Sequence, residues 1–154
     1  MSRISVVLPI FFVCTLVAGA DDAIAEVKRL QGEWQLVEIQ TKGKTVSKDD
    51  DGIKGMKFII KDNNMDVTTA KADGKERKKT FQVNPSKSPK EMDITSLDGQ
   101  EKGQTAACIY KLEKNKLTIC MPYFVKDPSL RPTEFKAGED DGLMVPVLER
   151  VMKN

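Results

Sequence analysis

The sequence contains no histidine among its 154 residues, and this absence excludes several kinds of chemistry. Without an imidazole, the chain cannot carry a serine–histidine or cysteine–histidine catalytic pair, a histidine metal ligand or a histidine pH switch. Its three cysteines are too few for an all-cysteine tetrahedral zinc site or a disulfide-dense scaffold. Carboxylate pairs remain as the main acid–base option, and no pair stands out by its spacing. We therefore expect a protein that is not an enzyme and has neither a metal nor a cofactor.

The N-terminal segment carries a single charge, Arg3, within residues 1–20. An apolar run at residues 4–17 follows it, and Ala18-Gly19-Ala20 closes the segment. A basic start, an apolar run and an Ala-x-Ala end are the order of a secretory signal peptide. The run is shorter than the about 20 residues that a helix needs to span a bilayer. We predict cleavage after Ala20, which leaves residues 21–154 as a secreted or periplasmic domain. The alternative is an uncleaved N-terminal anchor.

Beyond this segment, short β-type stretches alternate with turn sequences such as Asp62-Asn63-Asn64. One helix is predicted over residues 22–30, where Ile24, Val27 and Leu30 recur at helical spacing. Eight short antiparallel strands favour a closed barrel, because closure removes the two unpaired edges of an open sheet. The strands are predicted at residues 34–40, 56–61, 65–70, 76–83, 91–95, 104–112, 117–121 and 143–151.

The interior of an eight-stranded barrel is either filled by side chains or holds one small ligand. An interior void above about 300 Å³ would suit a ligand, whereas bulky inward side chains favour a filled core. Alternation along the strands predicts that the inward set is Trp34, Leu36, Phe58, Ile60, Val67, Phe81, Ile94, Tyr110, Leu112, Leu117, Ile119, Val145 and Val147.

Cys108 and Cys120 lie on two predicted strands that flank a turn at residues 113–116. If Leu112 lies opposite Leu117, the two cysteines point to opposite faces of the sheet, because successive side chains alternate. We then expect two buried thiols rather than a disulfide. A one-residue bulge would reverse this expectation.

Gly32-Glu33-Trp34 opens the first predicted strand directly after the helix, and Arg150 lies in the last strand. This arrangement resembles lipocalin-like (calycin) barrels, in which a Gly-x-Trp stands at that place and an arginine from the last strand packs across the tryptophan. The resemblance implies a barrel-closing cation–π contact between Arg150 and Trp34, and a structural role for Gly32.

A narrower resemblance covers nearly all of residues 30–151. The sequence is similar to an uncharacterised family of small secreted or modular bacterial domains, best known from planctomycetes. This resemblance implies a fold and no particular activity. Cys108 departs from it, because that family often has a small residue there. The motifs that carry the resemblance occur in the order Leu30-Gln31-Gly32-Glu33-Trp34, Pro85-Ser86-Lys87, Lys90-Glu91-Met92-Asp93-Ile94, Glu101-Lys102-Gly103, Ile109-Tyr110-Lys111-Leu112, Leu117-Thr118-Ile119-Cys120 and Arg131-Pro132-Thr133-Glu134-Phe135.

Two pairs of polar residues are candidate ligand contacts. Glu38 and Tyr110 would orient a ligand if both pointed into the apolar barrel. Alternatively, a kink turns Glu38 to solvent, and Tyr110 is a core residue with a tethered hydroxyl. Arg131 and Glu134 belong to the most distinctive loop, at residues 131–135, which is either a recognition loop or a structural corner.

Three charged stretches are interpreted as solvated surface. The acidic residues at 49–52 and 139–142 do not have the spacing of an EF-hand calcium loop. The basic hairpin at residues 71–79, which turns at Asp73-Gly74, could meet an anionic surface. Export and a net charge of only +2 argue against nucleic acid as a partner.

Together these features predict an exported, all-β, non-enzymatic barrel that binds a small apolar molecule. The alternative is a structural or protein-interaction domain of the cell envelope with a filled core. In either case, we expect no membrane-spanning segment in the mature chain.

Overall fold

The computed structural model describes residues 18–69, 75–123 and 125–152. Over these residues the chain forms one helix, α1 (Ala18–Leu30), and nine strands. The apolar run at residues 4–17 lies outside the described residues, as do residues 71–74 of the basic hairpin, which include the Asp73-Gly74 turn. The strands are β1 (Gly32–Thr41), β2 (Lys44–Ser47), β3 (Lys57–Lys61), β4 (Asn64–Thr68), β5 (Glu76–Asn84), β6 (Lys90–Ser96), β7 (Thr105–Glu113), β8 (Lys116–Pro122) and β9 (Leu143–Arg150).

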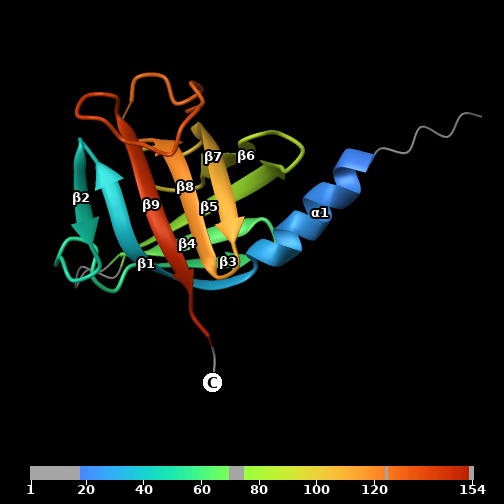
Figure 1. The fold of residues 1–154 in the computed structure, drawn as a ribbon, viewed down its shortest axis with the longest axis horizontal. Coiled ribbons are helices and arrows are strands. Elements are labelled where there is room, and N and C mark those ends of the chain that lie inside the picture. The colour runs from blue at the N-terminus through green and yellow to red at the C-terminus, as the bar shows by residue number, and fades with distance from the viewer. Residues whose placement is uncertain (1–17, 70–74, 124, 153–154) are drawn as a thin grey trace, which may run out of the picture.

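Eight of the strands close into an antiparallel barrel, as predicted (Figure 1). The strands from β3 to β9 pair in chain order, and β1 lies between β3 and β9 and completes the circle. The short strand β2 lies outside the eight predicted strands. It pairs only with the second half of β1, at Glu38–Thr41, beyond the part of β1 that pairs with β3. Helix α1 extends from one end of the barrel, before the first strand.

The barrel interior is filled with apolar side chains, and the predicted inward set is largely confirmed. Val145 and Val147 are the two errors. Leu148 pairs with Leu36, so the side chain of Leu148 enters the core and its neighbour Val147 faces the other side. Leu112 is half-buried against the core. The buried strand residues of this cluster are Trp34, Leu36, Phe58, Ile60, Met65, Val67, Phe81, Met92, Ile94, Cys108, Tyr110, Leu117, Ile119 and Leu148.

A second, smaller apolar cluster lies outside the barrel wall, where residues 135–137 cover strands β7 to β9. Val145, Ile109 and Cys120 are buried there beneath Phe135 and Ala137. Leu130, in the loop between β8 and β9, is 69% exposed, whereas the backbone N–H of Tyr123 donates to the Gly142 carbonyl at 2.7 Å.

The two cysteines face opposite sides of the sheet, as predicted. Leu112 pairs with Leu117 and Ile109 pairs with Cys120, which is the register that separates the thiols. Cys108 belongs to the interior cluster and Cys120 to the outer one, and both thiols are free and buried. Burial raises the pKa of Cys120 to about 11 and raises that of Cys108 further, so both thiols stay protonated at neutral pH.

Candidate functional site

The end of helix α1 is fixed to the barrel by the residues of the lipocalin-like motif. The indole Nε1 of Trp34 donates to the carbonyl of Leu30 over 2.9 Å. Arg150 lies over the Trp34 ring, with 4.1 Å between its guanidinium carbon and the ring centroid, which confirms the predicted contact. The same guanidinium donates to the carbonyls of Arg29 and Gln31. Arg29 lies in the last turn of α1 and Gln31 directly follows it, so Arg150 caps the helix as well as closing the barrel.

A buried carboxylate, Glu26, holds the middle of the helix against the barrel. Glu26 is only 4% exposed, and its Oε1 accepts from Lys90 Nζ at 2.7 Å and from the Tyr110 hydroxyl at 3.2 Å. Arg29 pairs with its other oxygen at 2.8 Å. Burial by itself would raise the pKa of Glu26, but Lys90, Arg29 and Tyr110 more than offset this and hold it below its usual range. Helical spacing gave no sign of this residue except its position four before Leu30, on the same face.

Glu38 and Tyr110 do not form the predicted ligand-orienting pair. Tyr110 is 1% exposed, and its hydroxyl is tethered to Glu26 rather than free in a cavity. The register between β1 and β9 shifts between Leu36 and Glu38, which is a β-bulge. Beyond the bulge, Ile39 packs on the core and Glu38 lies on the opposite face, near Gln40. The structure therefore agrees with the alternative for each residue. The bulge turns Glu38 out of the barrel interior, and Tyr110 is a core residue with a tethered hydroxyl.

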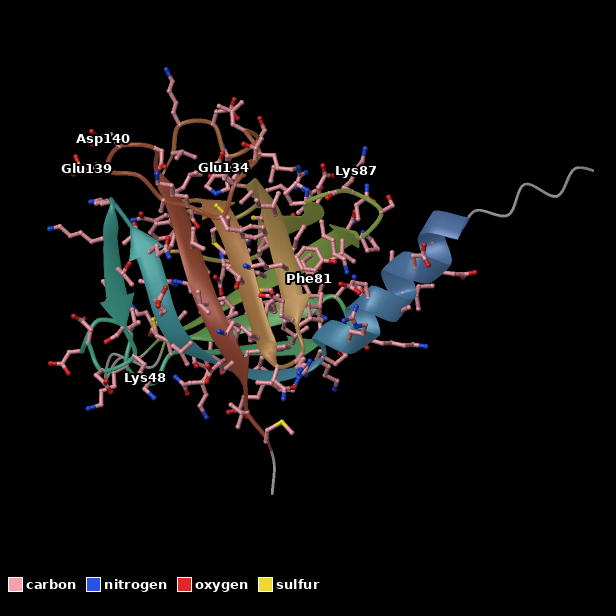
Figure 2. The ribbon with its side chains drawn as sticks, in the orientation of Figure 1. Lys48, Phe81, Lys87, Glu134, Glu139 and Asp140 are labelled. Atoms are coloured by element: carbon pink, nitrogen blue, oxygen red, sulfur yellow. The ribbon has the colours of Figure 1, made fainter. Side chains whose placement is uncertain are left out.

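Arg131 and Glu134 do not converge on a common site. Arg131 donates to the Cys108 carbonyl at 2.5 Å and to Asp93 Oδ1 at 2.6 Å, and it lies 3.6 Å from Glu91. It therefore fixes the loop onto the outer face of β6 and β7. Glu134 is exposed at one end of the barrel (Figure 2). The structural-corner alternative fits this loop.

The charged stretches use their side chains locally. In the acidic turns, Asp50 Oδ1 accepts from the Gly52 amide, and Asp141 accepts from the amides of Gly138 and Leu143. Across residues 18–69, 75–123 and 125–152, no group of three or more histidine, cysteine or carboxylate side chains is placed to hold a metal ion. In the basic stretch, Lys79 donates to Ser96 Oγ at 2.8 Å.

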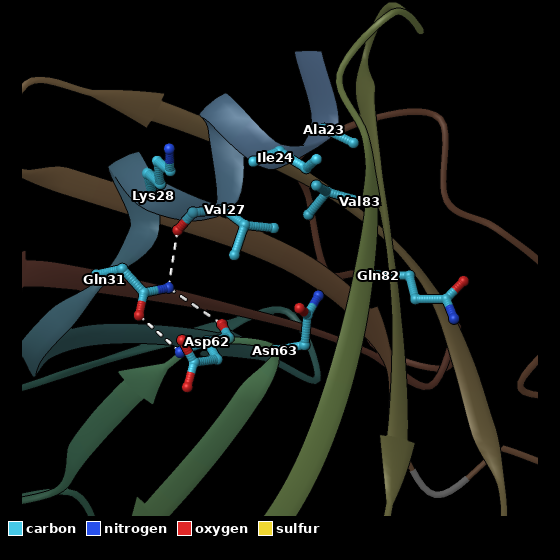
Figure 3. A pocket seen from close by; sticks show the side chains of 9 residues that line it. All are labelled: Ala23, Ile24, Val27, Lys28, Gln31, Asp62, Asn63, Gln82 and Val83. Carbon is cyan, nitrogen blue, oxygen red and sulfur yellow. Dashed lines mark hydrogen bonds between the residues drawn. The ribbon is translucent and has the colours of Figure 1, made fainter. Parts of the chain in front are cut away.

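A groove with a volume of about 500 Å³ lies beside the helix (Figure 3). Helix α1 forms one wall, the turn between β3 and β4 forms the floor, and the end of β5 forms the other wall. Ile24, one of the three apolar residues at helical spacing, lies at this groove and is 57% exposed. In Figure 3 the side chain of Val83 points from β5 towards Ile24. The groove is lined by Ala23, Ile24, Val27, Lys28, Gln31, Asp62, Asn63, Gln82 and Val83.

The Gln31 side chain links the helix wall of the groove to its floor by hydrogen bonds. Its amide nitrogen donates to the carbonyls of Val27 at 2.8 Å and Asp62 at 3.0 Å. Its amide oxygen accepts from the Asp62 backbone N–H at 2.6 Å. Three hydrogen bonds through one side chain make this a pre-formed groove rather than a loose gap between two elements.

A second hollow of about 220 Å³ adjoins the groove and shares Gln82 and Val83 with it. Its other lining residues are Asn84 and the carboxylates Glu91 and Asp93, both of which lie beside Arg131. The second hollow is therefore polar and partly occupied by internal ion pairs, whereas the groove presents the apolar side chains of the helix and of Val83.

No family model matches the chain, and no curated protein or solved structure matches it either. None of the helical residues that the structure describes forms a stretch both long and apolar enough to cross a membrane.

Proposed function

We propose that this chain is an exported, non-enzymatic binding protein that holds a small apolar molecule in the groove between α1 and the end of β5. The observation that carries the proposal is the groove itself. Its volume of about 500 Å³ falls within the range of small-molecule sites, about 300–1,000 Å³. Ala23, Ile24, Val27 and Val83 line it, and Ile24 leaves more than half of its surface to solvent.

Because side chains fill the barrel interior, we place the proposed ligand in this groove instead. Trp34, Phe58, Phe81 and Tyr110 occupy the interior, and their packing leaves the apolar space beside the helix as the better place for a ligand.

The titratable groups support a role in binding rather than in catalysis. Both thiols and the Tyr110 hydroxyl have raised pKa values, so they remain protonated and are poor nucleophiles at neutral pH. The buried carboxylate Glu26 is committed to Lys90, Arg29 and Tyr110.

An NMR titration of the full, ¹⁵N-labelled chain with isohexanol tests the proposal. Shifts concentrated on residues 23–31, 62–63 and 82–83 are expected. Ile24→Glu should abolish them, because a carboxylate would replace apolar surface on the helix wall. Leu130→Glu is the matched control, since Leu130 is 69% exposed on a loop outside the groove. An absence of saturable shifts, or equal binding by Ile24→Glu, would contradict the proposal.

The second candidate is a protein-interaction or structural domain of the cell envelope that works through its outer surface. The filled core favours it, because such a domain needs no cavity. If isohexanol does not bind and a cross-linked partner is lost in a variant of the outer surface, this candidate replaces the first.

A further inference from the structure

The wall of the groove that β5 forms is an open strand edge. The backbone N–H of Phe81 donates to the Asn63 carbonyl at 2.8 Å, and the Phe81 carbonyl accepts from the Asn63 side chain at 3.0 Å. Both backbone groups of Phe81 therefore point away from β6, towards the turn between β3 and β4. The partner strand β4 pairs with β5 only as far as Thr80. Beyond Phe81, that side of β5 faces the groove.

Val83 has the same backbone direction as Phe81, because the N–H and C=O groups of alternate residues in a strand point to the same side. On the β6 side, Val83 lies opposite Met92, in a pair that exchanges no backbone hydrogen bonds. Its N–H and C=O groups therefore point away from β6, to the side of β5 that adjoins the groove, and β4 does not extend far enough to pair with them. The strand-edge wall of the groove thus presents one backbone donor and one backbone acceptor at a fixed spacing.

We propose that the ligand is a short extended peptide with an apolar side chain, which pairs with Val83 as an added antiparallel strand residue. This proposal rests on the function proposed above and specifies its ligand. The N–H of the peptide residue donates to the Val83 carbonyl, and its C=O accepts from the Val83 N–H. A residue directly opposite Val83 places its side chain on the same face as that of Val83, towards Ile24 and Val27.

The geometry favours a peptide over a hydrocarbon. Once a ligand excludes water, leaving the backbone N–H and C=O groups of Val83 without hydrogen bonds costs free energy. A purely apolar ligand would cover Val83 without satisfying its N–H and C=O groups. A residue flanked by two amides would satisfy both groups and still bury its side chain against the helix.

The test compares N-acetyl-leucine N-methylamide with its ester analogue, in which an oxygen replaces the leucine N–H. Both probes are titrated against the full chain and followed through the ¹⁵N–¹H signal of Val83. The peptide probe should bind about fivefold tighter than the ester, as one net hydrogen bond predicts. It should also shift the Val83 N–H signal and slow its hydrogen exchange.

A matched pair of variants tests the other hydrogen bond. Val83→Ala keeps the backbone N–H, whereas Val83→Pro removes it. Proline is acceptable at a strand edge whose N–H does not serve the ladder. Both probes should bind about fivefold more weakly to Val83→Pro than to Val83→Ala, whereas isohexanol should bind the two variants equally. The fluorescence of Trp34 confirms that each variant is folded.

The outcomes separate this proposal from the one on which it rests. If isohexanol binds in the groove but the peptide probe binds no tighter than the ester, the strand-edge ligand is wrong and the apolar site stands. The strand-edge ligand is also wrong if Val83→Pro and Val83→Ala bind the peptide probe equally. If neither isohexanol nor the peptide probe binds, both proposals fail.

Discussion

Arg150 lies over the ring of Trp34, with its guanidinium carbon 4.1 Å from the ring centroid, and also donates to the carbonyls that end helix α1. One side chain of the last strand therefore joins the first strand and the helix. The groove depends on this junction, because α1 is one of its walls.

Arg150→Ala should lower the free energy of unfolding by about 2–3 kcal/mol, through loss of the cation–π contact and of charge-assisted hydrogen bonds to the helix end. Arg150→Lys should fall between Arg150→Ala and the wild type, because an ammonium keeps the charge but cannot span both carbonyls as a planar fork. Urea unfolding followed by the single tryptophan, Trp34, measures both. Equal stability of Arg150→Ala and the wild type would contradict the capping role.

Gly32→Ala should also destabilise the chain, by about 1–3 kcal/mol. Gly32 has a φ of +123°, which residues with a Cβ rarely adopt, and an added Cβ would lie 3.1 Å from Arg150 Nη1. Gly103→Ala is the control, since Gly103 also has a positive φ but nothing lies within 4 Å of its added Cβ. Thermal unfolding should show a lower midpoint for Gly32→Ala than for Gly103→Ala. A Gly32→Ala protein as stable as the wild type would show that the backbone relaxes here.

Glu26→Gln should cost about 2 kcal/mol at neutral pH, because the charge-assisted bonds to Lys90 and Tyr110 weaken. The pKa of Glu26 is below its ordinary value of 4.5 in the folded chain, so its ionised form stabilises the fold above that pH. This contribution is lost as the pH falls from about 4.5 through the folded pKa. The stability difference between wild type and Glu26→Gln should therefore shrink in acid. Urea midpoints across this pH range measure it, and a constant difference would argue against an ionised Glu26.

Thiol labelling tests whether Cys108 and Cys120 are both free and buried, as their positions on opposite faces of the sheet predict. In a Cys14→Ser chain, a disulfide-exchange reagent should label neither Cys108 nor Cys120 within minutes at neutral pH, and both after unfolding. Burial blocks access and raises both pKa values, so little thiolate is present. Recovery of fewer than two thiols after unfolding would reveal a disulfide that this register does not permit.

The barrel was predictable because its signals are local. Turn residues such as Asp62 and Asn63 and the alternation along single strands determine hairpins without any knowledge of the remaining fold. The errors arise where tertiary contacts decide. The side of the sheet on which the Val145 side chain lies depends on how β9 pairs with β1, which no local pattern reveals.

The site was less predictable than the fold. Alternation along their strands predicts that Glu38 and Tyr110 both point into the barrel, but a bulge turns Glu38 away. Glu26 resembles a solvated helix charge until Lys90 and Tyr110, far along the chain, are placed beside it. The groove depends on how α1 packs against β5, which the sequence of neither element reveals. Its sign in the structure is the exposed side chain of Ile24.

We propose that a small molecule occupies the groove beside α1 in the native host. Native mass spectrometry of the wild-type chain, Ile24→Glu and Leu130→Glu, all purified from that host, tests this proposal. We expect an additional bound mass of defined size on the wild type that is absent from Ile24→Glu and present on Leu130→Glu. A wild-type chain that carries no bound molecule, or the same molecule on all three chains, would contradict the claim.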